Sequence, residues 1–517
     1  MFPTIRILLR LLKIAHTLAR HDALAALEEL RVAPGILWLA RLASRRHAEG
    51  RPGQKLARAL TELGPSFIKL GQFFSTRADL LGETLAADLS NLQDRLPPFP
   101  SAQARTTIEA ELGQPLGDLF DHFEDQPVSA ASIAQVHNAV TTGEDGAAGR
   151  EVAVKVLRPG IERAFERDLE LFYWLATLVE RTQPRLRRFR PLQVVRLFEE
   201  TVRIEMDLAM EAAAASELTD NFAGDSTYRT PAIDWQRTSR RVLTMGRIGG
   251  IRIDDREALL AAGFDLEQVL SKAAAIFFNQ VFRDGFFHGD QHPGNMFIDE
   301  DGNIVAVDFG IMGRLDRDTR THLADMLLAL LARDYRRLAE VQAEAGYVPP
   351  GHALDTFAQA LRAVSEPVFD RPLHEISFAR VLARLLRLSE SFDMPVQPQL
   401  LLLQKNMMMA EGVSRRLVPE LNIWTLAQPL IEEWMRANRG PEARLRRAAQ
   451  DLTGTVERLP ALLSSVEAAA GDLASGGLRL HPDSLRALQT DGSARLARWA
   501  LTFAVVALMV ALAVAIL

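Results

Sequence analysis

The sequence has 517 residues, a formal net charge of −6 and no cysteine. A chain of this length exceeds what one compact core usually fills, so we expect two to four structural units. The lack of cysteine excludes a disulfide framework and thiolate chemistry, and no histidine cluster has zinc spacing. The acidic balance argues against a nucleic-acid partner.

Residues 1–20 form the first predicted element, because basic side chains recur there at helical spacing and no acidic one is present. Leucine and isoleucine occupy the other side, which predicts a basic amphipathic helix able to lie on an anionic membrane surface. An organellar transit peptide and a plain solvated helix are the alternatives. We assign residues 1–50 to such N-terminal helices. The basic residues are Arg6, Arg10, Lys13 and Arg20.

A helical extension is predicted over residues 51–125. Between about 53 and 94, leucine and phenylalanine recur in three- and four-residue steps and build one apolar stripe. Lys69 and Gln72 lie off that stripe, three residues apart, and therefore share a second helix face. Prolines at 97, 98 and 100 end this helical segment, and a short helix follows them.

The pattern then turns to β structure. Ser129–Ala139 and Glu151–Leu157 are apolar runs separated by a glycine-containing segment, which predicts a hairpin. The second run contains Val-Ala-Val-Lys ending at Lys155, similar to the kinase strand whose lysine binds the α- and β-phosphates of ATP. No G-x-G-x-x-G precedes it. An alanine- and serine-rich loop stands there instead, stiffer than glycine, and it should bind nucleotide differently.

A long helical segment is predicted from Pro191 to Phe222, and it carries Glu205, Asp207 and Glu211. Kinases place a helix glutamate opposite the strand lysine, because that ion pair holds the lysine on the phosphates. Glu211 and Glu205 are both candidates for this partner. Both follow the lysine at a greater distance than in ordinary protein kinases, so residues 126–250 should form a kinase-like N-lobe with a helical insertion.

The most informative stretch is His-Gly-Asp-Gln-His-Pro-Gly-Asn at residues 288–295, followed by Asp308-Phe309-Gly310. Asp290 and Asn295 have the D-x-x-x-x-N spacing of a kinase catalytic loop, in which the aspartate orients or deprotonates a nucleophile and the asparagine holds Mg²⁺. The apolar run before Asp308 should deliver this second Mg²⁺ ligand at the end of a short strand.

Residues 251–440 are predicted to form a mostly helical C-lobe, with a strand at Val242–Met245 leading into the hinge before it. Its helices are expected at roughly 317–345, 353–365, 375–391, 397–415 and 424–437, with Met407 to Met409 as core residues. No A-P-E follows the D-F-G, and a helix begins within about ten residues. Little room is left for an activation loop or a peptide-docking platform, which argues against protein substrates.

The C-terminal end differs from the rest. Residues 441–498 are charge-rich and interrupted by glycine, which predicts a helical tether. The run from Trp499 to Leu517 carries no charge and as a helix would span roughly 28 Å. Arg495 and Arg498 precede it, which predicts a single membrane anchor with the bulk of the protein on the cytoplasmic side. A buried C-terminal core helix is the alternative.

These patterns predict an α+β, bilobal protein-kinase-like fold with an N-terminal helical extension, a predominantly helical C-lobe and a C-terminal transmembrane helix. Four features together resemble the UbiB family of atypical kinase-like proteins, implicated in ubiquinone biosynthesis. They are Lys69-Leu70-Gly71-Gln72 as its K-x-G-Q, Ser129–Ser132 as its alanine-rich loop, Glu205-Met206-Asp207 as its E-x-D, and the H-x-D-x-H-P-G-N with D-F-G. The resemblance covers roughly residues 50–420. Bacterial members often carry two C-terminal spans, whereas one is predicted here.

The resemblance implies a role for each site residue. The K-x-G-Q extension would cover the peptide site, so that Lys69 and Gln72 point into the active site with Glu205 and Asp207 facing them. Lys155 would bind phosphates and pair with Glu211, Asp290 would be the catalytic-loop aspartate, and Asn295 and Asp308 would hold Mg²⁺. The expected nucleotide contacts are Ser129, Ala130, Ala131, Ser132, Ile133, Ala134, Gln135, Val136, Lys155 and Met245.

Two departures from the family pattern bear on the nucleotide. The loop usually has three alanines before its serine, and the first is Ser129 here, which affects nucleotide preference. The hinge glutamate common after the methionine is Gly246 here, which removes one contact on the adenine side.

The first hypothesis is therefore a Mg²⁺-dependent, ATP-binding kinase or ATPase at a membrane, the bacterial inner membrane, supporting polyprenyl quinone biosynthesis. Its expected partners are membrane lipids and a quinone-precursor lipid or quinone biosynthetic enzymes, with no nucleic acid; a homodimer is left open. A small-molecule phosphotransferase and a nucleotide-gated lipid-binding scaffold are the alternatives.

Overall fold

The chain divides into two compact units, Met1–Trp434 and Met435–Leu517. The computed structural model describes residues 3–23, 50–75, 83–90, 96–143, 148–182, 190–348, 353–369 and 398–421, with a few shorter pieces between them. All of these belong to the first unit. The predicted tether and the predicted membrane anchor lie outside the described residues. None of the helices that the structure describes is long and apolar enough to cross a membrane.

An antiparallel sheet forms the centre of the N-terminal part, with the order β1-β3-β4-β6 and β2 paired to β3. The predicted hairpin is confirmed, since β3 and β4 pair from Ala134 opposite Leu157 to Val140 opposite Glu151. Its first strand begins later than predicted because a turn follows β2. The strands are β1 (Phe120–Phe123), β2 (Ser129–Ala130), β3 (Ala134–Thr141), β4 (Glu151–Leu157) and β6 (Val242–Gly246).

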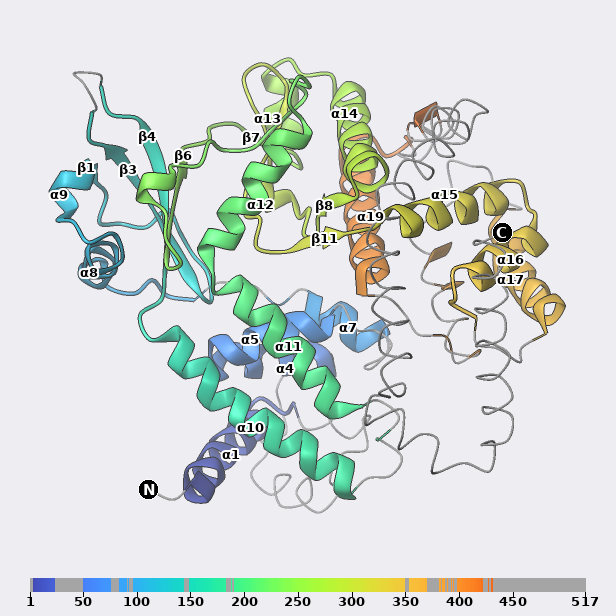
Figure 1. The fold of residues 1–517 in the computed structure, drawn as a ribbon, viewed down its shortest axis with the longest axis horizontal. Coiled ribbons are helices and arrows are strands. Elements are labelled where there is room, and N and C mark those ends of the chain that lie inside the picture. Colours follow the sequence, from blue (N-terminus) through green and yellow to red (C-terminus); the bar gives the residue numbers. More distant parts are fainter. Residues whose placement is uncertain are drawn as a thin grey trace, which may run out of the picture. The chain divides into compact units, whose positions relative to one another are not determined.

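The two faces of this sheet pack against different helices. The even-numbered valines of β4 share a core cluster with α8 (Ser101–Leu112), whereas Ala153 and Leu157 pack with residues of α4, α5, α10 and α11 (Figure 1). Successive side chains of a strand point to opposite faces. Lys155 therefore faces the side of the helical extension, and its side chain is held within the fold rather than at the outer α8 face.

The helical extension predicted over residues 51–125 is made of several helices. The helical segment predicted from about 53 to 94 is divided at Gly64, which has a φ of 108° and is followed by a proline. A positive φ favours glycine, and proline resists continuing a helix. Its helices include α4 (Pro52–Leu63), α5 (Pro65–Ser75) and α7 (Glu83–Ser90). The helices α1 (Pro3–Arg20), α10 (Ile161–Thr182) and α11 (Pro191–Glu205) come from outside the extension and pack near it.

The glycine of the K-x-G-Q sequence has a packing role. A Cβ on Gly71 would lie 2.8 Å from Leu60 Cδ1 and 3.2 Å from Leu92 Cδ1. The absence of a side chain therefore lets α5 approach α4 and the end of α7 closely. This close approach fixes the rotation of α5 and hence the direction in which its polar face points.

The predicted N-terminal helix is confirmed as α1, but its basic residues are not all on an outer face. Arg10 Nε donates to Asp168 Oδ1 at 2.9 Å, and its guanidinium lies 5.3 Å from the centre of the Phe67 ring. Leu9 and Leu12 are instead 53% and 59% exposed. The helix is therefore packed onto α5 and α10 through an arginine, and presents leucine outward.

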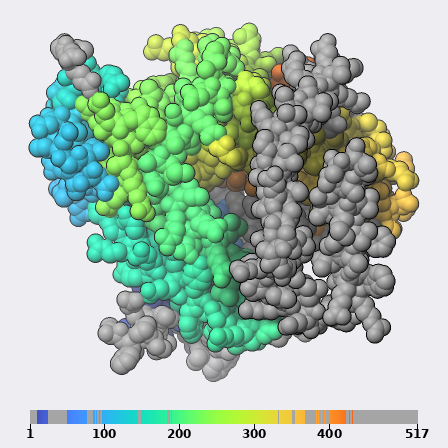
Figure 2. Space-filling model, in the orientation of Figure 1, coloured from blue at the N-terminus to red at the C-terminus, as the bar shows by residue number. Residues whose placement is uncertain are grey.

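The helical segment predicted over 191–222 is confirmed, but it consists of two helices that meet at the E-x-D sequence. α11 ends at Glu205, and Asp207 is the N-cap of α12 (Leu208–Asn221), with its Oδ1 accepting from the Ala209 amide at 3.1 Å. Aspartate is strongly preferred at an N-cap because it satisfies an otherwise unpaired amide. The break redirects the chain so that α12 packs on β6 (Figure 1). On the face shown in Figure 2, the atoms of α10, α11 and α12, coloured from teal to green along the chain, form one continuous surface.

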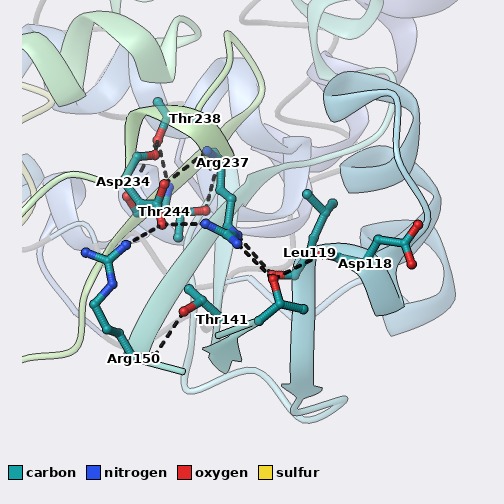
Figure 3. A network of polar contacts seen from close by, with 9 residues as sticks. Asp118, Leu119, Thr141, Arg150, Asp234, Arg237, Thr238 and Thr244 are labelled. Atoms are coloured by element: carbon teal, nitrogen blue, oxygen red, sulfur yellow. Dashed lines mark hydrogen bonds and ion pairs between the residues drawn. The ribbon is translucent and has the colours of Figure 1, made fainter. Parts of the chain in front are cut away.

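A buried arginine fixes the segment before β6 to the rest of the sheet. Arg237 Nε donates to the Leu119 carbonyl at 2.9 Å, and its two terminal nitrogens donate to Asp234 Oδ2 at 3.0 Å and Thr142 Oγ1 at 2.9 Å (Figure 3). Thr244 of β6 in turn donates to the Arg237 carbonyl at 2.7 Å. The predicted strand at 242–245 is thus confirmed, and its Thr244 is hydrogen-bonded to the segment that Arg237 anchors.

The C-terminal part contains two small sheets, one with the order β5-β10-β9-β7 and one formed by β8 and β11. Their strands are β5 (Tyr228–Arg229), β7 (Ile251–Arg252), β8 (Phe286–His288), β9 (Met296–Ile298), β10 (Ile304–Ala306) and β11 (Met312–Arg314). The described α-helices that follow β7 in the chain are α13 (Arg256–Ala261), α14 (Leu266–Phe278), α15 (Arg317–Leu331), α16 (Tyr335–Glu344), α17 (Leu354–Phe369) and α19 (Pro398–Leu417). The short helix α9 (Leu116–Leu119) precedes β1 in the N-terminal part.

Several helix predictions for this part are confirmed. α15 begins seven residues after Gly310, in agreement with the prediction of a helix within about ten residues of the D-F-G. The segment predicted over 317–345 consists of two helices, and Asp334 between them is the N-cap of the second. α19 matches the predicted 397–415, and most of the predicted 375–391 and 424–437 lies outside the described residues. Met408 is 55% exposed, so the prediction of a core position is wrong for it.

Candidate nucleotide and phosphoryl-transfer site

Lys155 is the centre of a buried charge cluster. Its Nζ lies 2.7 Å from Glu211 Oε1 and 3.0 Å from Asp308 Oδ1. The Lys155 and Glu211 side chains are only 11% and 4% exposed. Of the two glutamates that the sequence leaves open as the lysine's partner, the structure therefore selects Glu211, which the first turn of α12 carries. A buried ammonium group requires such a carboxylate partner.

The pKa values of the cluster reflect one cation shared by two carboxylates. Burial alone would lower the pKa of Lys155, but the charges of Asp308 and Glu211 outweigh it and raise that pKa above its ordinary value. The charge of Lys155 holds the pKa of Asp308 well below its usual range. Because the Asp308 side chain is half-exposed, solvent screens the two charges and reduces this lowering. Burial raises the pKa of Glu211, and the nearby Asp308 adds to this.

The backbone brings the two predicted magnesium ligands together. The Val307 amide donates to the Asn295 carbonyl at 2.9 Å, which joins the end of the catalytic loop to the end of β10. Asp308 follows with a φ of 63°, a left-handed conformation that is uncommon outside glycine and that clusters at functional sites. Asn295 Nδ2 donates to the Asp290 carbonyl at 3.2 Å, so its amide oxygen is the atom suited to a cation.

This donor set fits Mg²⁺, which prefers oxygen ligands and usually binds through one or two protein groups together with nucleotide phosphates. Asn295 and Asp308 would hold the ion, and the ion would neutralise charge on the phosphates. The cluster around Lys155 carries more carboxylates than ammonium groups, so an added cation is electrostatically favourable there.

The catalytic loop is held by a buried, neutral histidine. The Asp290 amide donates to His288 Nδ1 at 3.0 Å, and His288 Nε2 lies 3.3 Å from the Val307 carbonyl. This pattern assigns the proton to Nε2. Burial lowers the pKa of His288, which keeps the ring uncharged. Gln280, in the π-helical turn Asn279–Asp284, accepts from the His288 amide at 3.1 Å. Such turns occur frequently at functional sites.

Sequence reasoning missed two residues of α19 that contact this loop. Lys405 Nζ lies 2.7 Å from Asp290 Oδ1. Asn406 Nδ2 donates to the His288 carbonyl at 2.6 Å, and its Oδ1 accepts from the Gln291 amide at 3.3 Å. The available signal was a polar triplet, Gln-Lys-Asn, in the middle of the apolar run from 400 to 410. Helical periodicity alone interprets such a triplet as part of an exposed stripe.

The K-x-G-Q helix reaches the same region. Lys69 Nζ lies 3.0 Å from Glu205 Oε2, and the two side chains are 11% and 9% exposed. The charge of Lys69 also helps to lower the pKa of Asp308, after the larger effect of Lys155, so Lys69 lies within the electrostatic field of the site. The implied contact between Lys69 and Glu205 is confirmed. Gln72 is partly buried one turn further along α5.

Asp207 has a different position from the implied one. Its carboxylate caps α12, and Arg240 Nε lies 4.0 Å from its Oδ2. The E-x-D sequence therefore contributes one buried charge to the site, through Glu205, and one helix cap. The cap acts on the site indirectly, because it sets the start of the helix that carries Glu211.

The alanine-rich loop does not present all of its side chains to a nucleotide. Ser129 and Ala130 form β2, and the Ala131 amide donates to the Ala134 carbonyl at 2.8 Å to close a turn. Gln135 is buried on the α8 face of the sheet, where its Oε1 accepts from the Phe99 amide at 3.0 Å. The prediction of a nucleotide contact through the Gln135 side chain is therefore wrong, because alternation along β3 turns it away from Lys155.

The remaining predicted nucleotide residues lie as follows. Val136 is opposite Lys155 in the strand register and therefore shares its face. Met245 is buried on β6. The side chains of Ser132, Ile133 and Ala134 are buried, so a nucleotide would meet this part of the loop mainly through its backbone.

A small cavity lies behind the catalytic loop. Its volume is about 50 Å³, and α14, α19 and Gln291 line it together with Met296. Small-molecule sites are usually several hundred Å³. This cavity is therefore too small for a nucleotide.

Comparison with known proteins agrees with this geometry. A family model described as the ABC1 atypical kinase-like domain matches residues 91–342, and one described as the UbiB helical domain matches residues 361–422. The fold and site thus define an atypical kinase-like protein.

Relatives from bacteria identify the family within this class. A protein named "Probable protein kinase UbiB" from Marinobacter nauticus is 45% identical over 429 residues, covering 82% of this chain and 78% of the relative. A protein of the same name from Azotobacter vinelandii is 43% identical and covers 83% of this chain and 79% of its own length. Another from Xanthomonas axonopodis pv. citri is also 43% identical and covers 79% of this chain and 74% of its own length. The chain belongs to the UbiB family.

A solved complex of Rv3197 with erythromycin from Mycobacterium tuberculosis aligns with a TM-score of 0.46 at 23% identity, over 70% of this chain and 94% of that one. That likeness is too distant to bear on function.

Proposed function

We propose that this chain is a Mg²⁺-ATP-dependent atypical kinase or ATPase that works at a membrane in the biosynthesis of ubiquinone or a related polyprenyl quinone. The observation that carries the proposal is the contact of Lys155 with both Glu211 and Asp308. These groups and Asp290 and Asn295 make up the phosphoryl-transfer set of a kinase. The relatives named UbiB support the pathway.

Water or a lipid hydroxyl fits the site better as acceptor than a protein side chain does. α15 begins at Arg317, directly after the short strand that follows the D-F-G, so the described residues contain no extended activation segment on which a peptide could dock. Lys69 of α5 lies within the electrostatic field of Asp308. These two features support a small or lipid acceptor.

In the proposed reaction, Lys155 binds the α- and β-phosphates, and Glu211 holds the lysine in place. Asn295 and Asp308 hold the magnesium ion. Asp290 orients the acceptor hydroxyl or water and takes its proton. The predicted C-terminal anchor and N-terminal helix would keep this site near lipid-soluble molecules, since the anchor's apolar run is long enough to span a bilayer.

The test uses the full chain in detergent micelles and in anionic vesicles. Wild-type protein should hydrolyse ATP in a Mg²⁺-dependent manner, and vesicles or a phenolic quinone-precursor analogue should increase the rate. Asp308→Asn should lower kcat by about 100-fold or more, because it removes a metal-binding charge. Asp318→Asn, on the exposed first turn of α15, is the matched control and should retain the wild-type rate.

A genetic test separates the alternatives. Deleting the gene should stop quinone synthesis, and wild type should restore it while Asp308→Asn should not. Full function of a Lys155→Ala, Asp290→Ala double mutant would instead support a nucleotide-gated scaffold. Rapid phosphorylation of small alcohols or amines without lipid would support a small-molecule phosphotransferase.

A further inference from the structure

The ion pair between Lys405 and Asp290 joins the helical domain to the catalytic loop. Lys405 Nζ lies 2.7 Å from Asp290 Oδ1, and the two side chains are 25% and 31% exposed. Lys405 belongs to α19, within the matched UbiB helical domain at residues 361–422. An ion pair that solvent reaches in this way contributes little to folding stability. Its position on the catalytic-loop aspartate therefore requires another explanation.

Asn406 shows that this contact is built rather than incidental. It is fully buried and bonds to the loop on both sides of Asp290, at the His288 carbonyl and the Gln291 amide. Two consecutive residues of one helix thus hold the backbone and the carboxylate of the same short loop. Because the bonds of Asn406 fix the helix against the loop, the ammonium group of its neighbour is held at Asp290 with little freedom.

The loop itself offers no cation close to this carboxylate. Two residues after Asp290 the chain has His292, whose Nδ1 accepts from the Gly294 amide at 3.1 Å. That ring nitrogen is therefore used to shape the turn before Asn295. The next positions are proline and glycine, which carry no charge. A positive charge at Asp290 has to come from another element, and α19 provides it.

We propose that Lys405 is a positioning residue for phosphoryl transfer, which holds Asp290 Oδ1 so that Oδ2 faces the acceptor. This inference rests on the proposed function. In the step concerned, the acceptor oxygen forms a bond to the γ-phosphorus, and the bond from that phosphorus to the bridging oxygen breaks. ADP leaves with the electron pair, and the acceptor's proton passes to Asp290 Oδ2. Lys405 neither gives nor takes a proton in this step.

This role predicts a change in kcat rather than in nucleotide binding, because Lys405 contacts the loop that handles the acceptor. Lys155 and Asp308, which would bind the nucleotide, form a separate cluster with Glu211. A residue with only a structural role would lower thermal stability and nucleotide affinity together. Loss of a positioning residue would lower kcat while leaving thermal stability and nucleotide affinity nearly unchanged.

The test compares full-length Lys405→Met, Lys405→Arg and Arg415→Met in ATP hydrolysis, with Mg²⁺-ADP affinity and Tm measured alongside. Lys405→Met keeps the length of the side chain and removes its charge, and it should lower kcat by about 10-fold or more. KM for ATP and Mg²⁺-ADP affinity should change less than about twofold, and Tm by less than about 4 °C. Lys405→Arg should recover most of kcat. Arg415, exposed on the same helix, is the control and should behave as wild type.

Two results would overturn the inference alone: a wild-type kcat in Lys405→Met, or a loss that falls equally on kcat and Mg²⁺-ADP affinity and that arginine does not repair. Wild-type protein that binds Mg²⁺-ADP without turnover would overturn the proposed function and this inference together. As a second measurement, ethylamine should partly restore kcat to Lys405→Ala, since it supplies an ammonium group to the space left by the side chain, and ethanol should not.

Discussion

The charges on the two sides of the site are held in different ways. Around Lys155, two carboxylates share one buried ammonium group, and the residues come from β4, α12 and the D-F-G. Around Asp290, one partly exposed carboxylate is paired with a partly exposed lysine from the distant helix α19. The Lys155–Glu211 pair of the first cluster is buried, with the half-exposed Asp308 at its edge, whereas the second cluster is a partly exposed contact between a loop and a helix.

This difference teaches how the two halves of a phosphoryl-transfer site can be specified separately. Groups that would bind phosphates are locked by burial, because an unpaired charge there is costly. Asp290, which would meet the acceptor, is partly exposed and is held by Lys405 of the helical domain. Variation in that domain can therefore change the acceptor side without disturbing the nucleotide side.

The largest expected effect follows from removing the buried cation. Lys155→Met should abolish ATP hydrolysis and lower the free energy of unfolding by about 3 kcal/mol, because it leaves the buried Glu211 without its cation. Lys405→Met should lower that free energy by less than about 1 kcal/mol, since its pair is partly exposed. Urea denaturation of both variants measures the difference. Equal destabilisation by the two would contradict the contrast between the clusters.

A double variant sharpens this comparison. Lys155→Met combined with Glu211→Leu removes both members of the buried pair and should recover part of the lost stability without recovering activity. Continued instability of the double variant would mean that the loss arises from packing rather than from the unpaired charge.

A smaller effect is expected where the helical extension approaches the site. Gly71→Ala should lower the free energy of unfolding by about 1 kcal/mol, because the new methyl group would lie 2.8 Å from Leu60 Cδ1 and force the leucine to move. Gly117→Ala, where no atom lies within 4 Å of the added carbon, is the control and should be neutral or slightly stabilising. Chemical denaturation measures both.

The Gly71 substitution also tests how firmly α5 sets the site. Rotation of α5 would separate Lys69 from Glu205, so kcat should fall more than the loss of stability accounts for. A stable Gly71→Ala variant with wild-type kcat would show that the polar face of α5 tolerates displacement.

The chain sequence points to the residues of the candidate site more directly than to the residues that support them. Lys155, Asp290, Asn295 and Asp308 follow from local spacing and strand pattern, because each belongs to a short segment with its own signature. Lys405 could not be found in this way, since its partner lies 115 residues earlier and the polar triplet that contains it does not indicate what it contacts.

Two errors have related causes. The break at Asp207 was missed because helical periodicity continues through it, and only the cap shows that the chain turns. The direction of Gln135 was missed because it depends on where β3 begins, and a shift of one residue reverses every side chain of a strand. Register, caps and long-range contacts are settled by tertiary packing, which a single sequence records only weakly.

The smallest expected effect concerns a buried histidine in the N-terminal sheet. His137 Nδ1 donates to the Glu124 carbonyl at 2.8 Å, and its Nε2 lies 2.8 Å from the Gln135 amide nitrogen. Burial lowers the pKa of His137 below its ordinary value of 6.5. The unfolded chain therefore binds a proton more readily than the folded one, so the stabilisation is complete above about pH 6.5 and is lost as pH falls below it.

The expected slope is at most about 1.4 kcal/mol per pH unit for one such group. Urea unfolding at pH 7.5 and 5.5 should show a smaller loss on acidification for His137→Gln than for wild type. Val154→Ala, at the cross-strand partner of His137, is a destabilising control without a titrating group and should keep the wild-type loss. Because His288 is also buried with a lowered pKa, part of the acid sensitivity should survive in His137→Gln. If the variant loses as much stability as wild type on acidification, protonation of His137 does not lower the free energy of unfolding. The contact of His137 with the Gln135 side chain would then not contribute to the stability of the sheet.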